Sequence, residues 1–183
     1  MRPALQVIAD RGHGRLATIA HPRGDAWPAE RLSALAAAGV TVLVSALTSA
    51  ELHRLGLGGT AAEAERVGVE FVAFPVEDGG PPRDEAAKVV KMAGRLAAQV
   101  DGGRFVATQS FGGTGRSTLL ACLTLVLLGV SPGEALRRAG GEAGTPVTRD
   151  WLYDAAANLI PATEIPASDI PASEIPATDD AMA

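Results

Sequence analysis

The segment "RFVATQSFGGTGRSTLL", residues 104–120, decides the fold class that the sequence predicts. An apolar, strand-like stretch leads into a cluster of glycines and then into an apolar helical segment. This order predicts a buried strand, a tight loop and the first turn of a helix. At such a junction several backbone N–H groups point inward at the N-terminus of the helix, the positive end of its dipole. Phosphate or sulfate binds at such a place. The segment therefore predicts an anion-binding loop in an α/β protein.

The same strand-like composition recurs along the chain with little strict alternation, as expected for strands that are buried on both faces. The runs are 15–21, 41–47, 70–76 and 104–110. Predicted helices lie between them: 28–39 begins near a proline and ends at a glycine, and 81–100 has prolines and acids in its first turn. The alternation predicts an α/β fold with a mostly parallel central sheet and helices on both faces.

The composition excludes several classes of function. One cysteine, Cys122, excludes an intramolecular disulfide framework and a cysteine-rich zinc site, so no metal or cofactor is expected and Cys122 is interpreted as an inert buried thiol. No secretory signal is visible, and the apolar run 119–130 is too short to span a bilayer, so we expect a cytoplasmic protein with no membrane partner. That run is expected to be a buried core helix.

The charge and the repeats divide the chain into two parts. Five of the 21 acidic residues lie in the last 24 residues, and the remaining 16 match the 16 Lys and Arg, which argues against a nucleic-acid partner. Residues 160–179 repeat the pattern I-P-A-[ST]-[ED] four times, and proline at every fifth position forbids a continuous helix. We expect a domain over 1–159 and an acidic tail over 160–183, either a spacer or a site for a protein partner.

The glycine-rich loop itself has three interpretations. It is a tight connection that binds nothing, a nucleotide-binding loop of the G-x-x-x-x-G-K-[ST] type, or another phosphate loop. The second demands glycine at 110 and lysine at 116, where this chain has Ser110 and Arg116. Arg116 favours the third interpretation, a different type of phosphate loop, because a guanidinium binds two phosphate oxygens at once.

The spacing from Ser110 to Arg116 and Ser117 resembles the C-x5-R-[ST] loop of the cysteine-based protein tyrosine and dual-specificity phosphatases. The segment "FPVEDGGPP", 74–82, resembles the general-acid loop of that family, and 18–57 is similar to the N-terminal half of its bacterial members. The segment from 110 to 141 resembles the bacterial members and the kinase-associated phosphatases. The likeness covers residues from about 15 to 159 and implies a protein tyrosine phosphatase-like fold.

The resemblance implies a role for each matching residue. Arg116 and the loop amides would hold the phosphate, Asp78 would protonate the leaving oxygen, and the Ser117 hydroxyl would hydrogen-bond the nucleophile. The implied ligand is a phosphorylated protein residue or a small phosphate ester, with no cofactor. The implied phosphate-binding residues are Ser110, Phe111, Gly112, Gly113, Thr114, Gly115 and Arg116.

The sequence departs from the family at the reacting atom, since the usual His–Cys pair is replaced by Gln109 and Ser110. A thiol has a pKa of about 8.5, whereas an alcohol is nearer to water at about 15.7, a gap of ~10 kcal/mol. A serine nucleophile needs an adjacent base, and Gln109 supplies none. His21 follows the first predicted strand and is interpreted as a satisfied or exposed histidine. The chain is therefore expected to bind phosphate and to turn it over very slowly or not at all.

Three hypotheses about function stay open at this point. The chain is a pseudophosphatase, or an active phosphatase in which the natural residue 110 is cysteine and serine was introduced to trap a substrate, or a partner-binding protein with a relic loop. The double change at Gln109 and Ser110 favours natural divergence, because a trapping substitution leaves its neighbour in place. Asp78 favours retained chemistry, although an Asp-Gly-Gly-Pro turn also explains an aspartate there.

Overall fold

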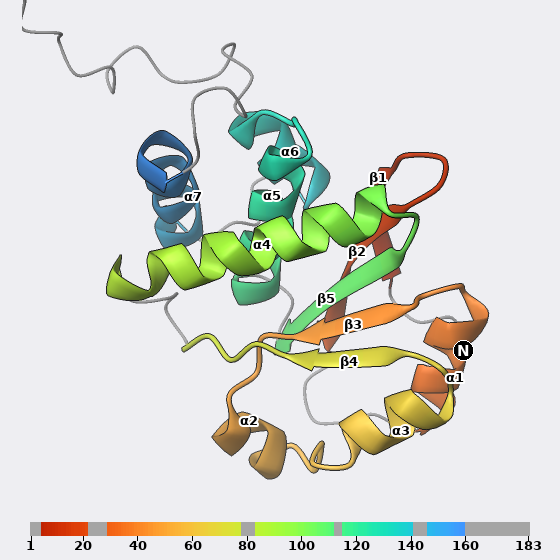
Figure 1. Ribbon diagram of the computed structural model, residues 1–183. Coiled ribbons are helices and arrows are strands. Elements are labelled where there is room, and N and C mark those ends of the chain that lie inside the picture. The colour runs from red at the N-terminus through yellow and green to blue at the C-terminus, as the bar shows by residue number, and fades with distance from the viewer. Residues whose placement is uncertain (1–4, 22–28, 78–82, 112–114, 141–145, 160–183) are drawn as a thin grey trace, which may run out of the picture.

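A five-stranded sheet organises the chain (Figure 1). The computed structural model describes residues 5–21, 29–77, 83–111, 115–140 and 146–159. The strands are β1 (Leu5–Asp10), β2 (Arg15–His21), β3 (Val42–Ser45), β4 (Glu70–Ala73) and β5 (Phe105–Phe111). The helices are α1 (Ala29–Ala37), α2 (Ser49–Arg54), α3 (Thr60–Arg66), η1 (Arg83–Glu85), α4 (Ala86–Asp101), α5 (Arg116–Leu127), α6 (Pro132–Arg138) and α7 (Pro146–Leu159).

The strand order is β1-β2-β5-β3-β4, with β5 in the centre. β5 pairs in parallel with β2 and with β3, and β3 pairs in parallel with β4. The predicted α/β class, with a mostly parallel central sheet flanked by helices, is confirmed. The carboxyl ends of β3, β4 and β5 consequently meet at one edge of the sheet, where ligands of open α/β folds bind.

Strand β1 was not predicted and pairs antiparallel with β2. The connection is a tight turn in which Arg11 N–H donates to the Gly14 carbonyl at 2.9 Å. β1 is an edge strand with exposed residues at both ends, so its six residues lack the continuous apolar character of the inner strands.

The ends of the predicted elements shift in the structure. The predicted strands 41–47 and 70–76 shorten to β3 (Val42–Ser45) and β4 (Glu70–Ala73). The predicted helix 81–100 begins as the short η1 and becomes α-helical only at Ala86. The short helices α2, α3 and α6 were not predicted, since six or seven residues hold too little apolar periodicity.

Two helical layers cover the sheet (Figure 1). α4, α5, α6 and α7 lie on one face, where Val42, Val44 and Val106 join the core. α1 and α3 lie on the other face with Leu43 and Ala107. Successive residues of one strand therefore enter different cores, as the pleat of a buried strand requires.

Helix α5 is the centre of the larger core. Every residue from Arg116 to Val126 is buried, against α4, α6, α7 and the sheet. This confirms a buried core helix for the apolar run, although the helix begins at Arg116 and ends at Leu127. None of the described helices combines the length and the apolar composition needed to cross a bilayer.

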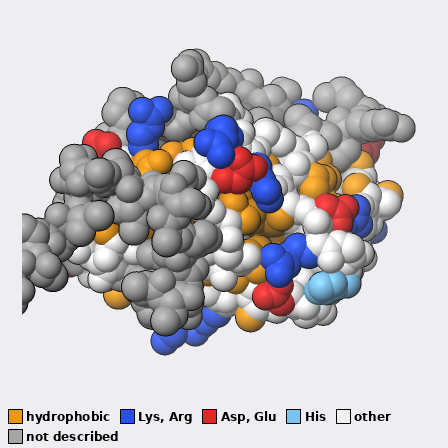
Figure 2. Space-filling view, turned by 90° about the horizontal axis from the view of Figure 1, so that it is seen from above, with side chains coloured by type: hydrophobic (Ala, Val, Ile, Leu, Met, Phe, Trp, Pro, Cys, Tyr) orange, Lys and Arg blue, Asp and Glu red, His pale blue; other side chains and the backbone are white. Residues whose placement is uncertain are grey.

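The surface carries both signs of charge. In the face seen from above, Lys and Arg side chains alternate with Asp and Glu (Figure 2). Glu134 on α6 pairs with both Arg137 and Arg138, each at 2.7 Å. The described residues on this face form no stripe of one sign of the kind that nucleic acids require.

Gly14 is required by the packing of the β1–β2 turn on α4. A Cβ atom at this position would lie 1.7 Å from the Val100 carbonyl oxygen, which is backbone and cannot rotate away. We expect Gly14→Ala to lower the free energy of unfolding by about 1–3 kcal/mol or more, measured by urea denaturation. Gly58→Ala is the control, because a Cβ there meets nothing within 4 Å. Equal stability of the two variants would contradict this packing.

Candidate functional site

Ser110 lies one residue before the end of the central strand β5, and its side chain faces the first turn of α5. Its side chain is buried, and its Oγ lies 2.8 Å from Ser117 Oγ. The Ser117 backbone N–H also donates to Ser110 Oγ at 3.4 Å. Thr108, two residues earlier on the same face of β5, donates its hydroxyl to the Ser117 carbonyl at 3.1 Å. The start of α5 is thus attached to β5 through side chains, and Ser110 Oγ lies where N–H and O–H groups converge.

Arg116 is the first residue of α5 and is buried, with 6% of its side chain exposed. Its guanidinium binds the Glu51 carboxylate at two points, Nη1 to Oε2 at 2.7 Å and Nη2 to Oε1 at 2.8 Å. Nη1 also donates to the Val76 carbonyl at 2.8 Å. One side chain therefore joins α5 to α2 and to the segment that follows β4.

Glu51 is a functional candidate that the sequence interpretation did not single out. It is the third residue of α2, and its carboxylate accepts hydrogen bonds from Thr48 N–H at 2.8 Å and Thr48 Oγ1 at 3.0 Å. The pattern "TSAE" at 48–51, directly after a strand, is the sequence signal of such a capping box. A capping box predicts where a helix begins. It does not predict the pairing of Glu51 with Arg116, because the two residues are 65 positions apart in the chain.

The pKa of Glu51 falls from its usual value near 4.5 to about 2. The hydrogen bonds from Arg116 are the largest cause, and burial opposes them by penalising the charged carboxylate. Glu51 is therefore ionised at every physiological pH, and the buried charge of Arg116 is always paired.

Gln109 points away from Ser110. It pairs with Ile19 of β2, whose side chain lies in the core beneath α1 and α3, whereas Ser110 faces α5. The Gln109 side chain is fully buried, and neither atom of its amide has a hydrogen-bond partner within the described part of the chain. Its backbone carbonyl accepts from Ala46 N–H at 2.9 Å. A general base at position 109 would therefore not reach the Ser110 hydroxyl.

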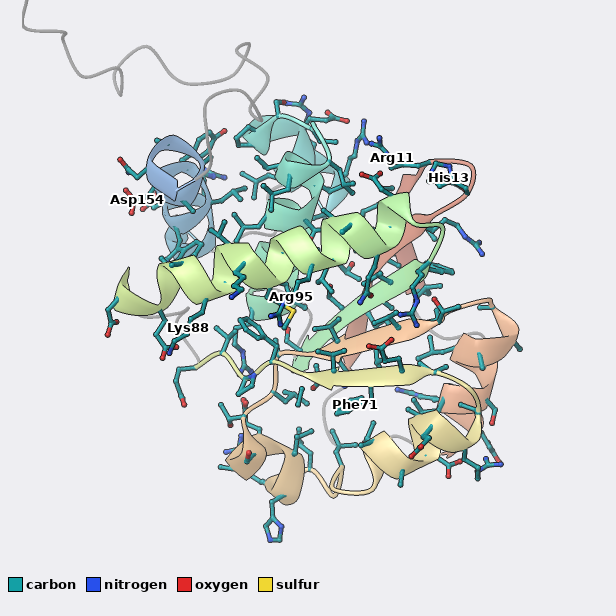
Figure 3. All side chains as sticks on the ribbon, viewed as in Figure 1. Arg11, His13, Phe71, Lys88, Arg95 and Asp154 are labelled. Atoms are coloured by element: carbon teal, nitrogen blue, oxygen red, sulfur yellow. The ribbon has the colours of Figure 1, made fainter. Side chains whose placement is uncertain are left out.

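Two of the three histidines have exposed side chains. His13 is exposed in the β1–β2 turn, at the end of the sheet opposite to Ser110 (Figure 3). His53 is exposed on α2. The backbone of His21 pairs with that of Phe111, and the structure does not describe its side chain. In the described ranges no three His, Cys, Asp or Glu residues gather as metal ligands do.

Several predicted site residues fall outside the described residues: Asp78, Gly112, Gly113 and Thr114, together with the side chain of Phe111. The structure brings together Ser110, Ser117 and Arg116, with Gly115 as the residue before α5. Val76, whose carbonyl binds Arg116, precedes Asp78 by two positions. The roles implied for the site residues stay predictions.

Cys122 lies in the middle of α5 and is buried. Burial raises the pKa of its thiol to about 12, because the apolar surroundings penalise the thiolate. At neutral pH the thiol stays protonated and out of reach, as an inert core residue does.

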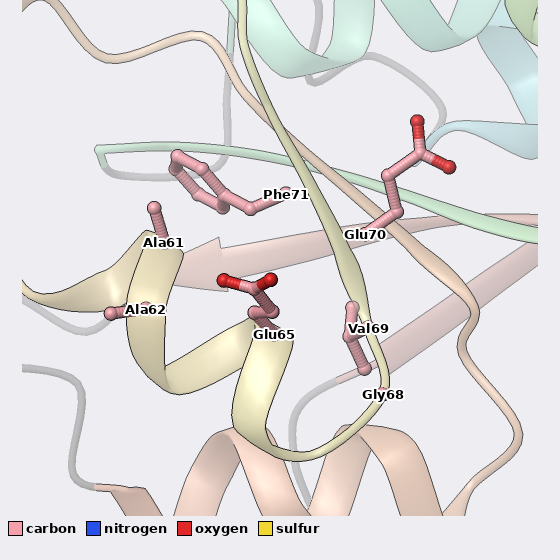
Figure 4. A pocket seen from close by; sticks show the side chains of 7 residues that line it. All are labelled: Ala61, Ala62, Glu65, Gly68, Val69, Glu70 and Phe71. Atoms are coloured by element: carbon pink, nitrogen blue, oxygen red, sulfur yellow. The ribbon is translucent and has the colours of Figure 1, made fainter.

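An open hollow lies on another part of the surface, between α3 and β4 (Figure 4). Its lining includes Phe71, Val69 and the two acids Glu65 and Glu70. The sheet edge that carries Ser110 and Arg116 contributes no residue to it. Carboxylates repel a phosphate dianion, so this hollow does not suit the ligand implied by the loop.

Solved structures with a similar fold include several phosphatases. A kinase associated phosphatase with a serine substituted for its catalytic-site cysteine is 20% identical, with a TM-score of 0.74 over 87% of this chain and 97% of that one. Tk-PTP in its active form is 22% identical, with a TM-score of 0.67 over 87% of this chain and 100% of that one. This chain has the phosphatase fold.

The likeness extends to a putative phosphatase from Shewanella putrefaciens, which is 18% identical with a TM-score of 0.59 over 85% of this chain and 93% of that one. No family model and no curated protein matches the sequence. Identities of 18–22% show the fold alone, so the ligand and the chemistry have to be argued from the residues of this chain.

The Glu51–Arg116 pair predicts a pH dependence of stability. The pKa of Glu51 is lower in the folded chain, so its stabilisation is complete above about pH 5 and is lost as the pH falls through about 2. The shift from 4.5 to about 2 corresponds to about 3 kcal/mol. We expect the stability difference between the unaltered chain and Glu51→Gln, measured by urea denaturation, to shrink by about this amount between pH 5 and pH 2.

Glu63→Gln is the control for this measurement. Glu63 also pairs with a guanidinium, that of Arg66, at 2.6 Å. This pair lies on the surface, where solvent screens it. We expect a much smaller dependence on pH for that variant. A stability difference for Glu51→Gln that stays constant from pH 5 to pH 2 would contradict the pKa assigned to Glu51.

Proposed function

We propose that this phosphatase-fold protein binds the phosphate group of a phosphorylated protein residue or a small phosphate ester at the β5–α5 junction. The observation that carries the proposal is the buried first turn of α5, where Arg116 is held in place and Ser117 donates toward Ser110. A helix N-terminus with an adjacent guanidinium suits a phosphate dianion in both charge and geometry. The phosphatase fold of the chain supports this ligand class.

We further propose that the chain with Ser110 hydrolyses such an ester very slowly or not at all. Among the described residues, Ser110 Oγ contacts the hydroxyl and the N–H of Ser117, and neither is a base strong enough to remove its proton. Hydrogen-bond donors of this kind offset only part of a gap of ~10 kcal/mol between an alkoxide and a thiolate. Serine in the catalytic-site position of the kinase associated phosphatase structure is compatible with the same fold.

With cysteine at position 110, the roles that the resemblance implies give a reaction in two steps. The thiolate attacks phosphorus, the S–P bond forms, and the bond from phosphorus to the leaving oxygen breaks as Asp78 gives that oxygen a proton. Water then attacks phosphorus, passes a proton to the Asp78 carboxylate, and the S–P bond breaks to release phosphate and the thiolate. Ser117, at 2.8 Å from the position 110 side chain, would stabilise the thiolate each time it leaves.

The binding proposal is tested by calorimetric titration of the full chain with inorganic phosphate, vanadate and a phosphopeptide. We expect Arg116→Lys to weaken binding at least about tenfold, because lysine keeps the charge but cannot make two parallel hydrogen bonds. Arg66→Lys is the matched control, since Arg66 makes a similar pair with Glu63 on the surface. If the chain binds none of these ligands, the binding proposal is wrong and the hypothesis of a partner-binding protein with a relic loop is favoured instead.

The chemical proposal is tested by Ser110→Cys. We expect this variant to hydrolyse p-nitrophenyl phosphate much faster than the unaltered chain, because the attacking atom is then a thiolate at neutral pH. Asp78→Ala in the same background should lower the rate by about 10²–10⁴, the usual contribution of a general acid. A folded Ser110→Cys variant that binds phosphate without turning it over would show that the site has diverged beyond the nucleophile.

A further inference from the structure

We propose that the outer edge of β4, together with the hollow between β4 and α3, binds an extended segment of a partner protein that carries an arginine or lysine side chain. The main chain of that segment would add to the sheet as a further strand, and its cationic side chain would enter the hollow. The lining of the hollow includes no residue of the β5–α5 junction, so the inference is independent of the proposed function.

The outer side of β4 offers backbone groups for such pairing. β4 is the last strand of the sheet, so one of its sides has no neighbouring strand among the described residues (Figure 1). The N–H groups of Glu70 and Phe74 donate to carbonyls at the two ends of β3, at 3.0 and 2.9 Å. Backbone groups of successive residues point to opposite sides of a strand, so those of Phe71 and Ala73 point outward.

These outward groups have no hydrogen-bond partner in the part of the chain that the structure describes. A row of unpaired N–H and C=O groups at the edge of a sheet matches the backbone of another extended chain. β3 and α3 are the described elements that pack most closely on β4, and neither covers this side. The edge therefore specifies the main-chain conformation of its partner, which is an extended strand.

The hollow beside this edge specifies a side chain. Its volume is about 520 Å³. The side chains of Phe71 and Glu65 project into it from its two walls, whereas that of Glu70 projects from the opposite side of β4 (Figure 4). The apolar part of the lining is formed by Ala61, Ala62, Val69 and Phe71.

This lining suits a side chain that is apolar along its length and cationic at its end. Phe71 and the alanines can contact methylene groups, as the stems of arginine and lysine require. Glu65 is exposed and makes no ion pair with the described residues, so its carboxylate can bind the cationic group. An acidic side chain would be repelled by Glu65, and a purely apolar one would leave its charge without a partner.

The edge and the hollow can be occupied by the same segment, because Phe71 belongs to both. A strand added to β4 would run about 4.8 Å from it, and every second side chain of that strand would lie on the α3 face of the sheet. The Phe71 side chain packs on that same face. Pairing with the Phe71 backbone therefore places a side chain of the partner over the hollow.

The probe for this surface is the blocked pentapeptide acetyl-Thr-Val-Arg-Val-Thr-amide, whose valines and threonines favour an extended chain. A second peptide has glutamate in the central position, and acetyl-arginine amide supplies the cation without the strand. Nuclear magnetic resonance titration of the ¹⁵N-labelled full chain measures the three affinities. We expect the arginine peptide to bind at least about tenfold more tightly than either comparison ligand. If it does not bind, or binds no better than these two, the inference is wrong.

Amide hydrogen exchange tests the backbone pairing on the unaltered chain. The amides of Glu70 and Phe74 bind β3 and should exchange slowly with or without peptide. Those of Phe71 and Ala73 should exchange faster in the free chain, and a saturating concentration of the arginine peptide should slow them severalfold. Unchanged exchange at Phe71 and Ala73 would show that the peptide does not add to the strand, which contradicts the inference.

Glu65→Lys tests the hollow, because it reverses the charge that faces the central side chain of the peptide. We expect this variant to prefer the glutamate peptide to the arginine peptide. Glu63→Lys is the matched control: Glu63 lies on the same helix but does not line the hollow, so that variant should keep the preference for arginine. A Glu65→Lys variant that still prefers the arginine peptide would overturn the inference.

Ala73→Pro tests the edge, since proline removes one outward N–H and is tolerated at such positions of an edge strand. We expect the affinity for the arginine peptide to fall about three- to tenfold, the equivalent of one hydrogen bond. Ala73→Ser keeps the N–H and is the control. Circular dichroism and thermal melting establish that both variants are folded at the temperature of the titration. Equal affinities of the two folded variants would count against strand addition.

Discussion

The buried charge of Arg116 is the constraint on which this edge of the molecule depends. A guanidinium that is 6% exposed requires a charged partner and hydrogen-bond acceptors, because an unpaired charge is costly away from water. Glu51 supplies the charge, and the Val76 carbonyl supplies a further acceptor. Three segments, the start of α5, the start of α2 and the strand exit at 74–77, are therefore held in one arrangement by one side chain.

That arrangement explains why the site belongs to the tertiary structure rather than to the loop alone. Backbone hydrogen bonds also connect the segments at this edge. Ala46 N–H donates to the Gln109 carbonyl, and Val76 N–H donates to the Ala46 carbonyl. These contacts bring the exits of β3 and β4 beside the exit of β5. A loop that carries a phosphate would thus rest on a framework whose hydrogen bonds do not involve the ligand.

The departure at positions 109 and 110 affects chemistry and packing separately. Ser110 faces α5 and concerns the attacking atom, whereas the Gln109 side chain enters the opposite core, where its amide is buried without a partner in the described residues. Adjacent residues of a strand point to opposite faces, so the two substitutions lie in different environments. Gln109 therefore affects the core beneath α1 and α3, whereas Ser110 belongs to the proposed phosphate site.

Much of the fold was predictable from local signals. The strands β2, β3, β4 and β5 and the helices α1, α4 and α5 follow from apolar runs with clear boundaries, and these runs predicted a mostly parallel α/β sheet. The edge strand β1 and the short helices α2, α3 and α6 were missed, because short or half-exposed segments have no strong period. Of the candidate site, the segment from Ser110 to Ser117 was identified, since its glycines and its arginine are adjacent in the chain.

The sequence by itself determined the fold class, the position of the predicted anion-binding loop and the residue types at positions 109 and 110. Only the tertiary structure decided that Glu51 pairs with Arg116, that Gln109 faces away from Ser110, and that Val76 joins the site. The physical reason is the range of the interactions. Helix starts, turns and strand periods are set by neighbours within a few residues, whereas the partner of a buried charge is chosen by whichever segments the sheet brings to the same edge.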